Sequence, residues 1–305
     1  MRYAAVAHIF NVLEKPGRSS RPATGGRGHL AEFLAIHESD ASLLGCVLRK
    51  YAGKLALGSA EQAAGVGFFQ SDDVLLRKRP LAGQVAAPER LADGVESEAV
   101  LICSGAVATG GVPPRSFREE TTLPFRFKRW LFAIAGNPEA LAPSRTELAA
   151  ALPDYLRRSA RGDGGAEYLF LTFLAKLRDV GRLDDFYVDA QTAARALAAA
   201  VGAAERASET NGASPLSLAT VATNGRVLAT LRRGHPLWIG SVDGLVECAR
   251  CELAPGTPEM SPLLRAHKAL QARLVFSGET APAGFTAVAD GQIVGIGRDL
   301  RVIQI

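Results

Sequence analysis

The sequence predicts an α+β fold in which antiparallel sheets and helices form separate layers. Strand-like segments come first, helical segments dominate residues 144–207, and short strands return toward the end of the chain. This order differs from the strand–helix alternation of βαβ units, which argues against a parallel sheet. The chain has 305 residues, 48% of them hydrophobic, which is enough to bury a large core.

The N-terminal part is expected to combine a strand, a loop and two short helices. Residues 1–13 alternate small, apolar and polar side chains, as a strand does. Residues 15–28 are rich in Gly, Pro, Ser and Arg, which is typical of a loop. A short helix is expected to begin in residues 30–35, and a second one in residues 42–51.

Strands are expected from residue 65 onward. The turn Ser71-Asp72-Asp73 separates two strand-like runs, residues 66–70 and 74–78, and this arrangement predicts a β-hairpin. Residues 99–103 form an apolar run with the character of a buried strand, and residues 127–134 form another.

Helices are expected over residues 144–207. Ser144 and Glu147 have the spacing of a capping box, which predicts a helix start at Ser144. Residues 167–180 carry large apolar side chains on one face, as an amphipathic helix does. Residues 190–207 are rich in alanine and helical by propensity.

Short strands are expected in the last third of the chain. The dipeptide Asn224-Gly225 is its strongest hairpin signal, because both residues tolerate the positive φ of a tight turn. The expected strands are residues 216–223, 227–232, 236–240, 274–277 and 292–296.

Several segments resemble the class II glutamine amidotransferases, which are N-terminal-nucleophile (Ntn) hydrolases that release ammonia from glutamine. The two most similar segments are TTLPFRFKRWLFAIAG (residues 121–136) and GDGGAEYLFLTFLAKLRDVG (residues 162–181). Weaker similarity lies in residues 65–69, 223–240 and 290–305, so the resemblance covers nearly the whole chain. It implies a single domain, residues 1–305, with a four-layer αββα sandwich of two facing antiparallel sheets.

The resemblance also implies that the catalytic nucleophile is missing. In the family this residue is a cysteine directly after the initiator methionine, and its freed α-amino group acts as the general base. Here the matching residue is Arg2. A guanidinium stays protonated in proteins and is not a nucleophile. The family's reaction therefore cannot proceed in the usual way.

Other groups that the family uses are replaced as well. The oxyanion-hole asparagine and glycine match Ala135 and Gly136, so that only the glycine amide is retained. The arginine that holds the substrate carboxylate falls near Gly105, and the aspartate that holds its amino group matches Gly165. This coordinated loss predicts a catalytically inactive member of the family.

Four cysteines and several histidines are candidates for other chemistry. Cys248 and Cys251 form a C-x-x-C pair, and His235 and His267 are the nearest histidines along the chain. Their spacing matches no standard zinc finger, so we expect a turn with two partly buried thiols and no metal site. Cys103 and Ser104 could act as substitute nucleophiles, but we expect Cys103 to be a small core residue.

The composition argues against nucleic-acid binding and against a membrane-spanning segment. A net charge of +4 with scattered basic residues argues against nucleic-acid binding, and no apolar run is long enough to span a membrane. The cysteine spacing forms no disulfide framework, so the cytoplasm is the expected compartment. No cofactor is expected.

These observations favour a protein that acts by binding, as a regulatory subunit, scaffold or partner of an active enzyme or of a second copy of itself. The alternatives are an amidohydrolase with a different nucleophile or a metal, and a sensor of small amino-acid-like metabolites.

Overall fold

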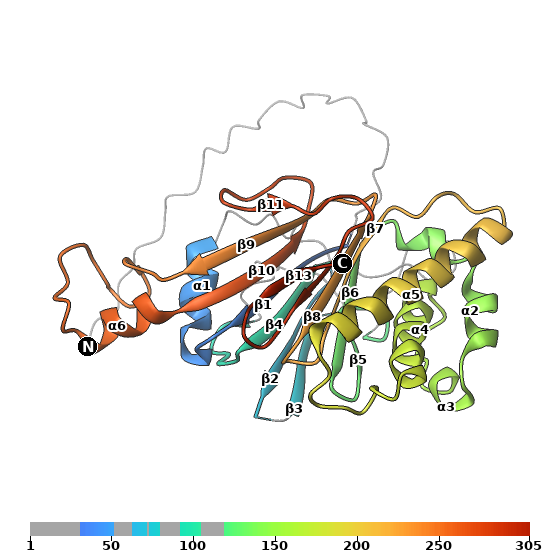
Figure 1. The fold of residues 1–305 in the computed structure, drawn as a ribbon, viewed down its shortest axis with the longest axis horizontal. Coiled ribbons are helices and arrows are strands. Elements are labelled where there is room, and N and C mark those ends of the chain that lie inside the picture. The colour runs from blue at the N-terminus through green and yellow to red at the C-terminus, as the bar shows by residue number, and fades with distance from the viewer. Residues whose placement is uncertain (1–30, 52–62, 72, 80–91, 105–118) are drawn as a thin grey trace, which may run out of the picture.

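The computed structural model describes residues 31–51, 63–71, 73–79, 92–104 and 119–305 (Figure 1). The strand expected over residues 1–13, the loop over residues 15–28, Arg2 and Gly105 lie outside the described residues. No helix in the described part of the chain has the length and apolarity needed to cross a membrane.

Seven of the described strands form one antiparallel sheet in the order β11-β9-β10-β1-β4-β2-β3. The bounds are β1 (Glu32–Glu38), β2 (Ala64–Gln70), β3 (Asp73–Arg79), β4 (Ala99–Ser104), β9 (Leu237–Asp243), β10 (Gln271–Ser277) and β11 (Thr286–Ala287). The central strand β1 is buried from Phe33 to Glu38, because it has strands on both sides and apolar layers on both faces.

Six described strands form the second sheet, in the order β13-β12-β8-β7-β6-β5, and all its named pairs are antiparallel. The bounds are β5 (Phe125–Phe127), β6 (Trp130–Gly136), β7 (Leu218–Thr223), β8 (Leu228–Arg233), β12 (Ile293–Ile296) and β13 (Val302–Gln304). The hairpin predicted at Asn224-Gly225 joins β7 to β8. The Asn224 side chain accepts hydrogen bonds from the backbone N–H groups of Arg226 and Val227, both at 3.0 Å.

Helices cover the outer face of each sheet and complete a four-layer α/β/β/α sandwich. On the six-stranded sheet lie α4 (Gly165–Asp179) and α5 (Ala190–Thr210), with α2 (Arg145–Ala151), α3 (Asp154–Arg157) and the 3-10 helix η3 (Pro138–Leu141) beside them (Figure 1). On the seven-stranded sheet the helical layer is thinner. It holds η1 (Ala41–Leu43), α1 (Leu44–Tyr51) and α6 (Pro262–Ala269), which lies in the connection between β9 and β10.

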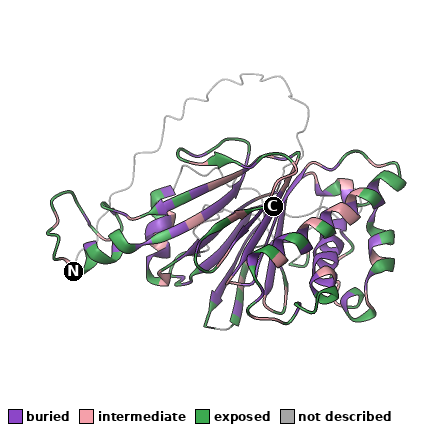
Figure 2. Cartoon of the chain, in the orientation of Figure 1, coloured by how far each residue is buried: buried purple, intermediate pink, exposed green. Residues whose placement is uncertain are grey.

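The core is divided by the seven-stranded sheet, because successive side chains of a strand point to opposite faces. Phe33 and Ala35 of β1 belong to the large apolar cluster that fills the space between the sheets and under α4 and α5. Leu34 and Ile36 belong to a smaller cluster that packs under α1 and α6. Figure 2 shows these buried residues running along both sheets.

The α+β class with facing antiparallel sheets is confirmed, but one local prediction was wrong and two others are confirmed only in part. The helix expected to begin in residues 30–35 is not observed, and residues 32–35 belong to β1, because a strand buried on both faces shows no alternation and cannot be told from a helix by periodicity. The strand expected over residues 127–134 is observed as β6 but starts later, at Trp130, since Lys128 has a φ of +50° and turns the chain between β5 and β6. The helix start predicted at Ser144 is confirmed, since Ser144 is the N-cap residue of α2, but its hydroxyl donates to the carbonyl of Leu141 in η3 and forms no capping hydrogen bond.

Candidate functional site

The residues expected from the sequence resemblance to correspond to an oxyanion hole, Ala135 and Gly136, lie where β6 ends, next to the start of β1. Gly136 is the last residue of β6 and forms an isolated antiparallel bridge with Ala31. Its φ is +97°, and a Cβ at this position would overlap the Ser217 carbonyl oxygen and lie 3.0 Å from the His235 side chain. Glycine is therefore required here for both conformation and space.

The side chains at this junction offer little chemistry. Ala31 and Ala135 are both buried and carry neither a nucleophile nor a hydrogen-bond donor. His235 is buried beside Gly136, and burial lowers its pKa and favours the neutral imidazole. Its Nε2 atom has no hydrogen-bond partner among the described residues.

Gly165 is the first residue of α4 and lies against η3. A Cβ at this position would overlap the Leu141 carbonyl oxygen and lie 2.6 Å from the Leu141 Cβ. By contrast, the nearby Glu167 has a clear structural role. Its two carboxylate oxygens accept hydrogen bonds from the backbone N–H groups of Arg161 (2.8 Å) and Gly162 (2.7 Å), so that it fixes the loop before the helix.

Cys103 and Ser104 end β4, the strand beside β1. Cys103 lies in the apolar cluster between the sheets with 0% of its surface exposed, and burial raises the pKa of its thiol. The thiol is therefore protonated near neutral pH and inaccessible to a substrate. The Ser104 hydroxyl is also buried and has no hydrogen-bond partner in the part of the chain that the structure describes.

The C-x-x-C pair lies elsewhere, beneath the outer face of the seven-stranded sheet. Cys248 and Cys251 meet Cys46 of α1 and His267 of α6, and the ligand atoms of all four residues lie within 4.8 Å of one another. His235, the other histidine considered from the sequence, lies at the Gly136 junction instead. Cys46 was missed because it is 205 residues away from Cys251 and no local spacing points to it.

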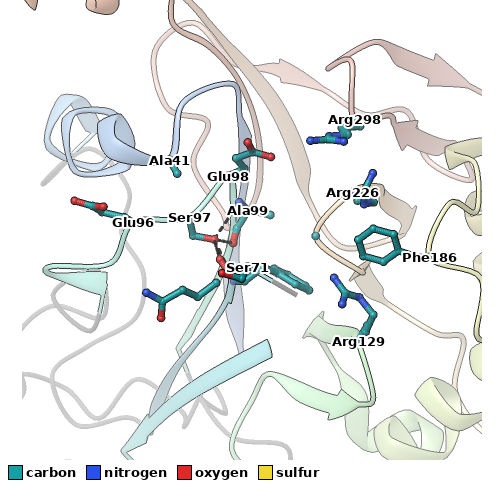
Figure 3. Close-up of a pocket in the computed structure, with 13 residues that line it drawn as sticks. Ala41, Ser71, Glu96, Ser97, Glu98, Ala99, Arg129, Phe186, Arg226 and Arg298 are labelled. Carbon is teal, nitrogen blue, oxygen red and sulfur yellow. Dashed lines mark hydrogen bonds between the residues drawn. The ribbon is translucent and has the colours of Figure 1, made fainter. Parts of the chain in front are cut away.

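A third feature is a cavity of about 300 Å³ at the other end of the sandwich (Figure 3). Its charged lining residues come from separate connections, so the sequence contains no motif for it. Arg129 precedes β6, Arg226 lies in the β7–β8 turn and Arg298 follows β12. Because Arg129 precedes β6 and Gly136 ends it, this cavity and the Gly136 junction lie at opposite ends of that strand.

Aromatic contacts order the arginines of this cavity. The guanidinium carbon of Arg129 lies 4.1 Å from the ring centroid of Phe186, and that of Arg226 lies 3.8 Å from it. Glu96 and Glu98 line the opposite wall, as Figure 3 shows. The cavity therefore presents positive and negative groups to the same small volume.

Comparisons with known proteins agree with the arrangement of the layers. A protein from Silicibacter pomeroyi, described as a glutamine aminotransferase class-II domain protein, matches 90% of this chain and 98% of its own, with a TM-score of 0.56 and 17% identity. The fold is that of a class II glutamine amidotransferase domain. A predicted glutamine amidotransferase from Pseudomonas aeruginosa aligns over 90% of this chain and 99% of its own, with a TM-score of 0.49 and 15% identity. No protein-family profile and no curated protein sequence matches the chain.

Proposed function

We propose that this chain is a catalytically inactive protein with the class II glutamine amidotransferase fold and that it acts by binding. The observation that carries the proposal is the junction of β1 and β6. There the Gly136 amide is retained, but the adjoining side chains are those of Ala31 and Ala135. An acyl-transfer site needs a nucleophile near its oxyanion donors. The methyl side chains of Ala31 and Ala135 are neither nucleophiles nor hydrogen-bond donors.

The substrate-binding groups support the same conclusion. The position that matches the family's aspartate is Gly165, which lies too close to the Leu141 backbone to leave room for a side chain. Glu167, which fixes the same loop, is present. In the described part of the chain, Glu167, which shapes this loop, is thus present, while the side chain that would hold the amino group of glutamine is missing at Gly165. We infer that the partner is a protein, either an active enzyme or a second copy of this chain.

The purified full-length protein should release no ammonia from glutamine, and neither should its Arg2→Cys variant. Loss of one oxyanion donor alone costs about 3 kcal/mol of transition-state stabilisation, and several groups are missing here. Glutamate and ammonia should be measured over several pH values, with an active class II glutamine amidotransferase as the positive control. Steady ammonia release by either form would contradict the proposal. Recovery of activity in Arg2→Cys alone would mean that the remaining site is intact.

A second candidate function is the sensing of an amino-acid-like metabolite, and the charged cavity favours it. Arg129, Arg226 and Arg298 suit a carboxylate, while Glu96 and Glu98 suit an ammonium group. The cavity volume of about 300 Å³ is at the small end of the range for ligand sites.

For this second function, titration calorimetry with glutamine, glutamate and aspartate should detect binding that Arg226→Gln weakens at least about tenfold, because one charge-assisted hydrogen bond is lost. Arg206→Gln, which removes an arginine from helix α5 away from the cavity, is the matched control. Equal affinity of the two variants would place the ligand elsewhere, and no binding by any of the three amino acids would contradict this second candidate.

A further inference from the structure

Cys46, Cys248, Cys251 and His267 form a compact cluster from three separate parts of the chain. Cys46 lies on α1, Cys248 and Cys251 lie between β9 and α6, and His267 lies on α6. Cys46, Cys248 and His267 are buried, and Cys251 is half-buried. Among the described residues, these are the only histidines and cysteines that gather in this way.

The distances fit a tetrahedral metal site better than they fit a disulfide. With metal–sulfur bonds of about 2.3 Å, the ligand atoms of a tetrahedral zinc site lie about 3.8 Å apart. Here all four atoms lie within 4.8 Å of one another, and the sulfurs of Cys46 and Cys251 are 3.4 Å apart. A disulfide requires a sulfur–sulfur distance of about 2.05 Å.

The C-x-x-C turn is shaped to hold both thiols on one side. Cys248 and Leu253 form a backbone pair, with a hydrogen bond of 3.0 Å in each direction, and this pair closes the turn around Cys251. Glu252 completes the turn with a φ of +54°, a conformation that is unfavourable for a non-glycine residue. Such local strain persists only where the surroundings require it, and it often lies beside functional groups.

His267 is oriented in the way that a metal ligand requires. Its Nδ1 lies 2.9 Å from the Leu263 carbonyl oxygen, to which it donates, so that the lone pair is on Nε2. This Nε2 atom is buried and has no hydrogen-bond partner within the described ranges, and the residue is 0% exposed. A histidine that donates one ring N–H to a carbonyl and directs the other nitrogen into a thiol cluster is the usual arrangement at a zinc site.

We propose that Cys46, Cys248, Cys251 and His267 bind one structural zinc ion. Three sulfur ligands and one imidazole in a closed tetrahedral set suit Zn²⁺, which is four-coordinate in such sites. On binding, the three thiols release their protons to the solvent. The resulting complex carries a single net negative charge, and three nearby cationic side chains make its surroundings electrostatically favourable. Arg49 and Lys50 line the adjoining groove, and the Arg250 guanidinium packs against Gly45, next to Cys46.

The role of the ion follows from the thin outer layer of the seven-stranded sheet. In the described part of this layer, α1 and α6 have 8 residues each, whereas α4 and α5 on the other side have 15 and 21. A zinc ion would fasten α1 to the β9–β10 connection and thereby stabilise this layer. The site lies on the opposite face of the sheet from the Gly136 junction, so it does not depend on the proposed function.

The test uses the full-length protein, expressed in zinc-supplemented medium and desalted. Elemental analysis should find about one zinc per chain, as a single four-ligand site requires. The Co²⁺-substituted protein should show the intense visible ligand-field bands of tetrahedral cobalt and a near-ultraviolet thiolate-to-cobalt band. Cys46→Ser should lose most of the metal. Cys103→Ser, which alters a buried cysteine outside the cluster, should retain it and serves as the matched control.

Because loss of a ligand could also unfold the protein, a fourth variant keeps the test decisive. His267→Cys retains four ligands, so it should bind about one metal ion per chain, with a stronger thiolate-to-cobalt band than wild type. Wild-type protein without stoichiometric zinc, even after reconstitution with Zn²⁺, would overturn the proposal. An octahedral cobalt spectrum, a Cys46–Cys251 disulfide in mass spectra, or equal metal loss from Cys46→Ser and Cys103→Ser would overturn it as well.

Discussion

Glu38 should lower the free energy of unfolding by about 1.4 kcal/mol for each pH unit between about pH 6.5 and pH 9. This carboxyl group ends β1, is 4% exposed, and its oxygens have no hydrogen-bond partner among the residues described. Burial, aided by the negative charges of Asp40 and Glu98, raises the pKa of Glu38 to about 9. The fold therefore holds a protonated carboxylic acid near neutral pH.

The sign of the effect follows from proton binding. Above the ordinary pKa of 4.5 the unfolded chain loses the Glu38 proton, while the folded chain keeps it up to about pH 9. Stability due to this group is thus complete below pH 4.5 and declines as the pH rises. His37 acts oppositely, because burial lowers its pKa from 6.5 to about 4, so that its contribution is lost as the pH falls through that range. The two effects offset each other between about pH 4.5 and pH 6.5. Above about pH 7 the pKa of Cys248, which burial raises but hydrogen bonds lower to about 7 overall, has the opposite effect to that of Glu38, so the Glu38 contribution is the difference between the slopes of wild type and Glu38→Gln.

Urea denaturation at several pH values between 6.5 and 9 will measure this slope. Glu38→Gln should remove the Glu38 contribution, because the amide does not titrate, so the variant should gain about 3 kcal/mol relative to wild type between pH 6.5 and pH 9. Glu209→Gln changes an exposed carboxylate and is the control, with an unchanged slope. Equal slopes in wild type and Glu38→Gln would mean that Glu38 is ionised in the folded protein.

Features that are local in the chain could be read from the sequence. The hairpin at Asn224 was predicted because the turn depends on two adjacent residues. The Asn224 side chain accepts hydrogen bonds from the turn backbone, and Gly225 adopts the positive φ that the turn requires. The α+β class followed from the order of strand-like and helical segments. The strand β1 could not be recognised, because it is buried on both faces and its pattern depends on two layers that are distant in sequence.

The candidate sites depend even more on the fold. The Cys248–Cys251 pair was visible, but Cys46 becomes its neighbour only when α1 packs under the β9–β10 connection. His267 was considered as a ligand from the sequence, and the fold brings it to the pair while it takes His235 elsewhere. The arginine-lined cavity gathers residues from three separate strand connections, and no spacing rule relates those residues.

Gly165→Asp should destabilise the fold by about 3 kcal/mol or more, even though local rules favour it. An aspartate in the first turn of a helix interacts well with the helix dipole and gains about 0.3–1 kcal/mol. It also replaces glycine, the poorest helix former after proline. However, its Cβ would overlap the Leu141 carbonyl oxygen, and its carboxylate would be buried against a carbonyl of like partial charge. Steric overlap and burial of charge should therefore outweigh the local gain.

Chemical denaturation of Gly165→Asp and Gly165→Ala, compared with Gly202→Asp, separates these effects. Gly202 lies in α5, and within 4 Å of its Cβ position only the Arg206 guanidinium is found, at 3.4 Å, so aspartate fits there and can pair with that arginine. Gly202→Asp should thus be neutral or slightly stabilising, while both Gly165 variants lose stability. If Gly165→Asp were as stable as wild type, α4 could move away from η3 and make room for the family's aspartate. The missing aspartate side chain at position 165 would then be a single substitution that the surrounding packing does not enforce. A large loss would instead mean that the packing of α4 on η3 leaves no room for an aspartate side chain at position 165.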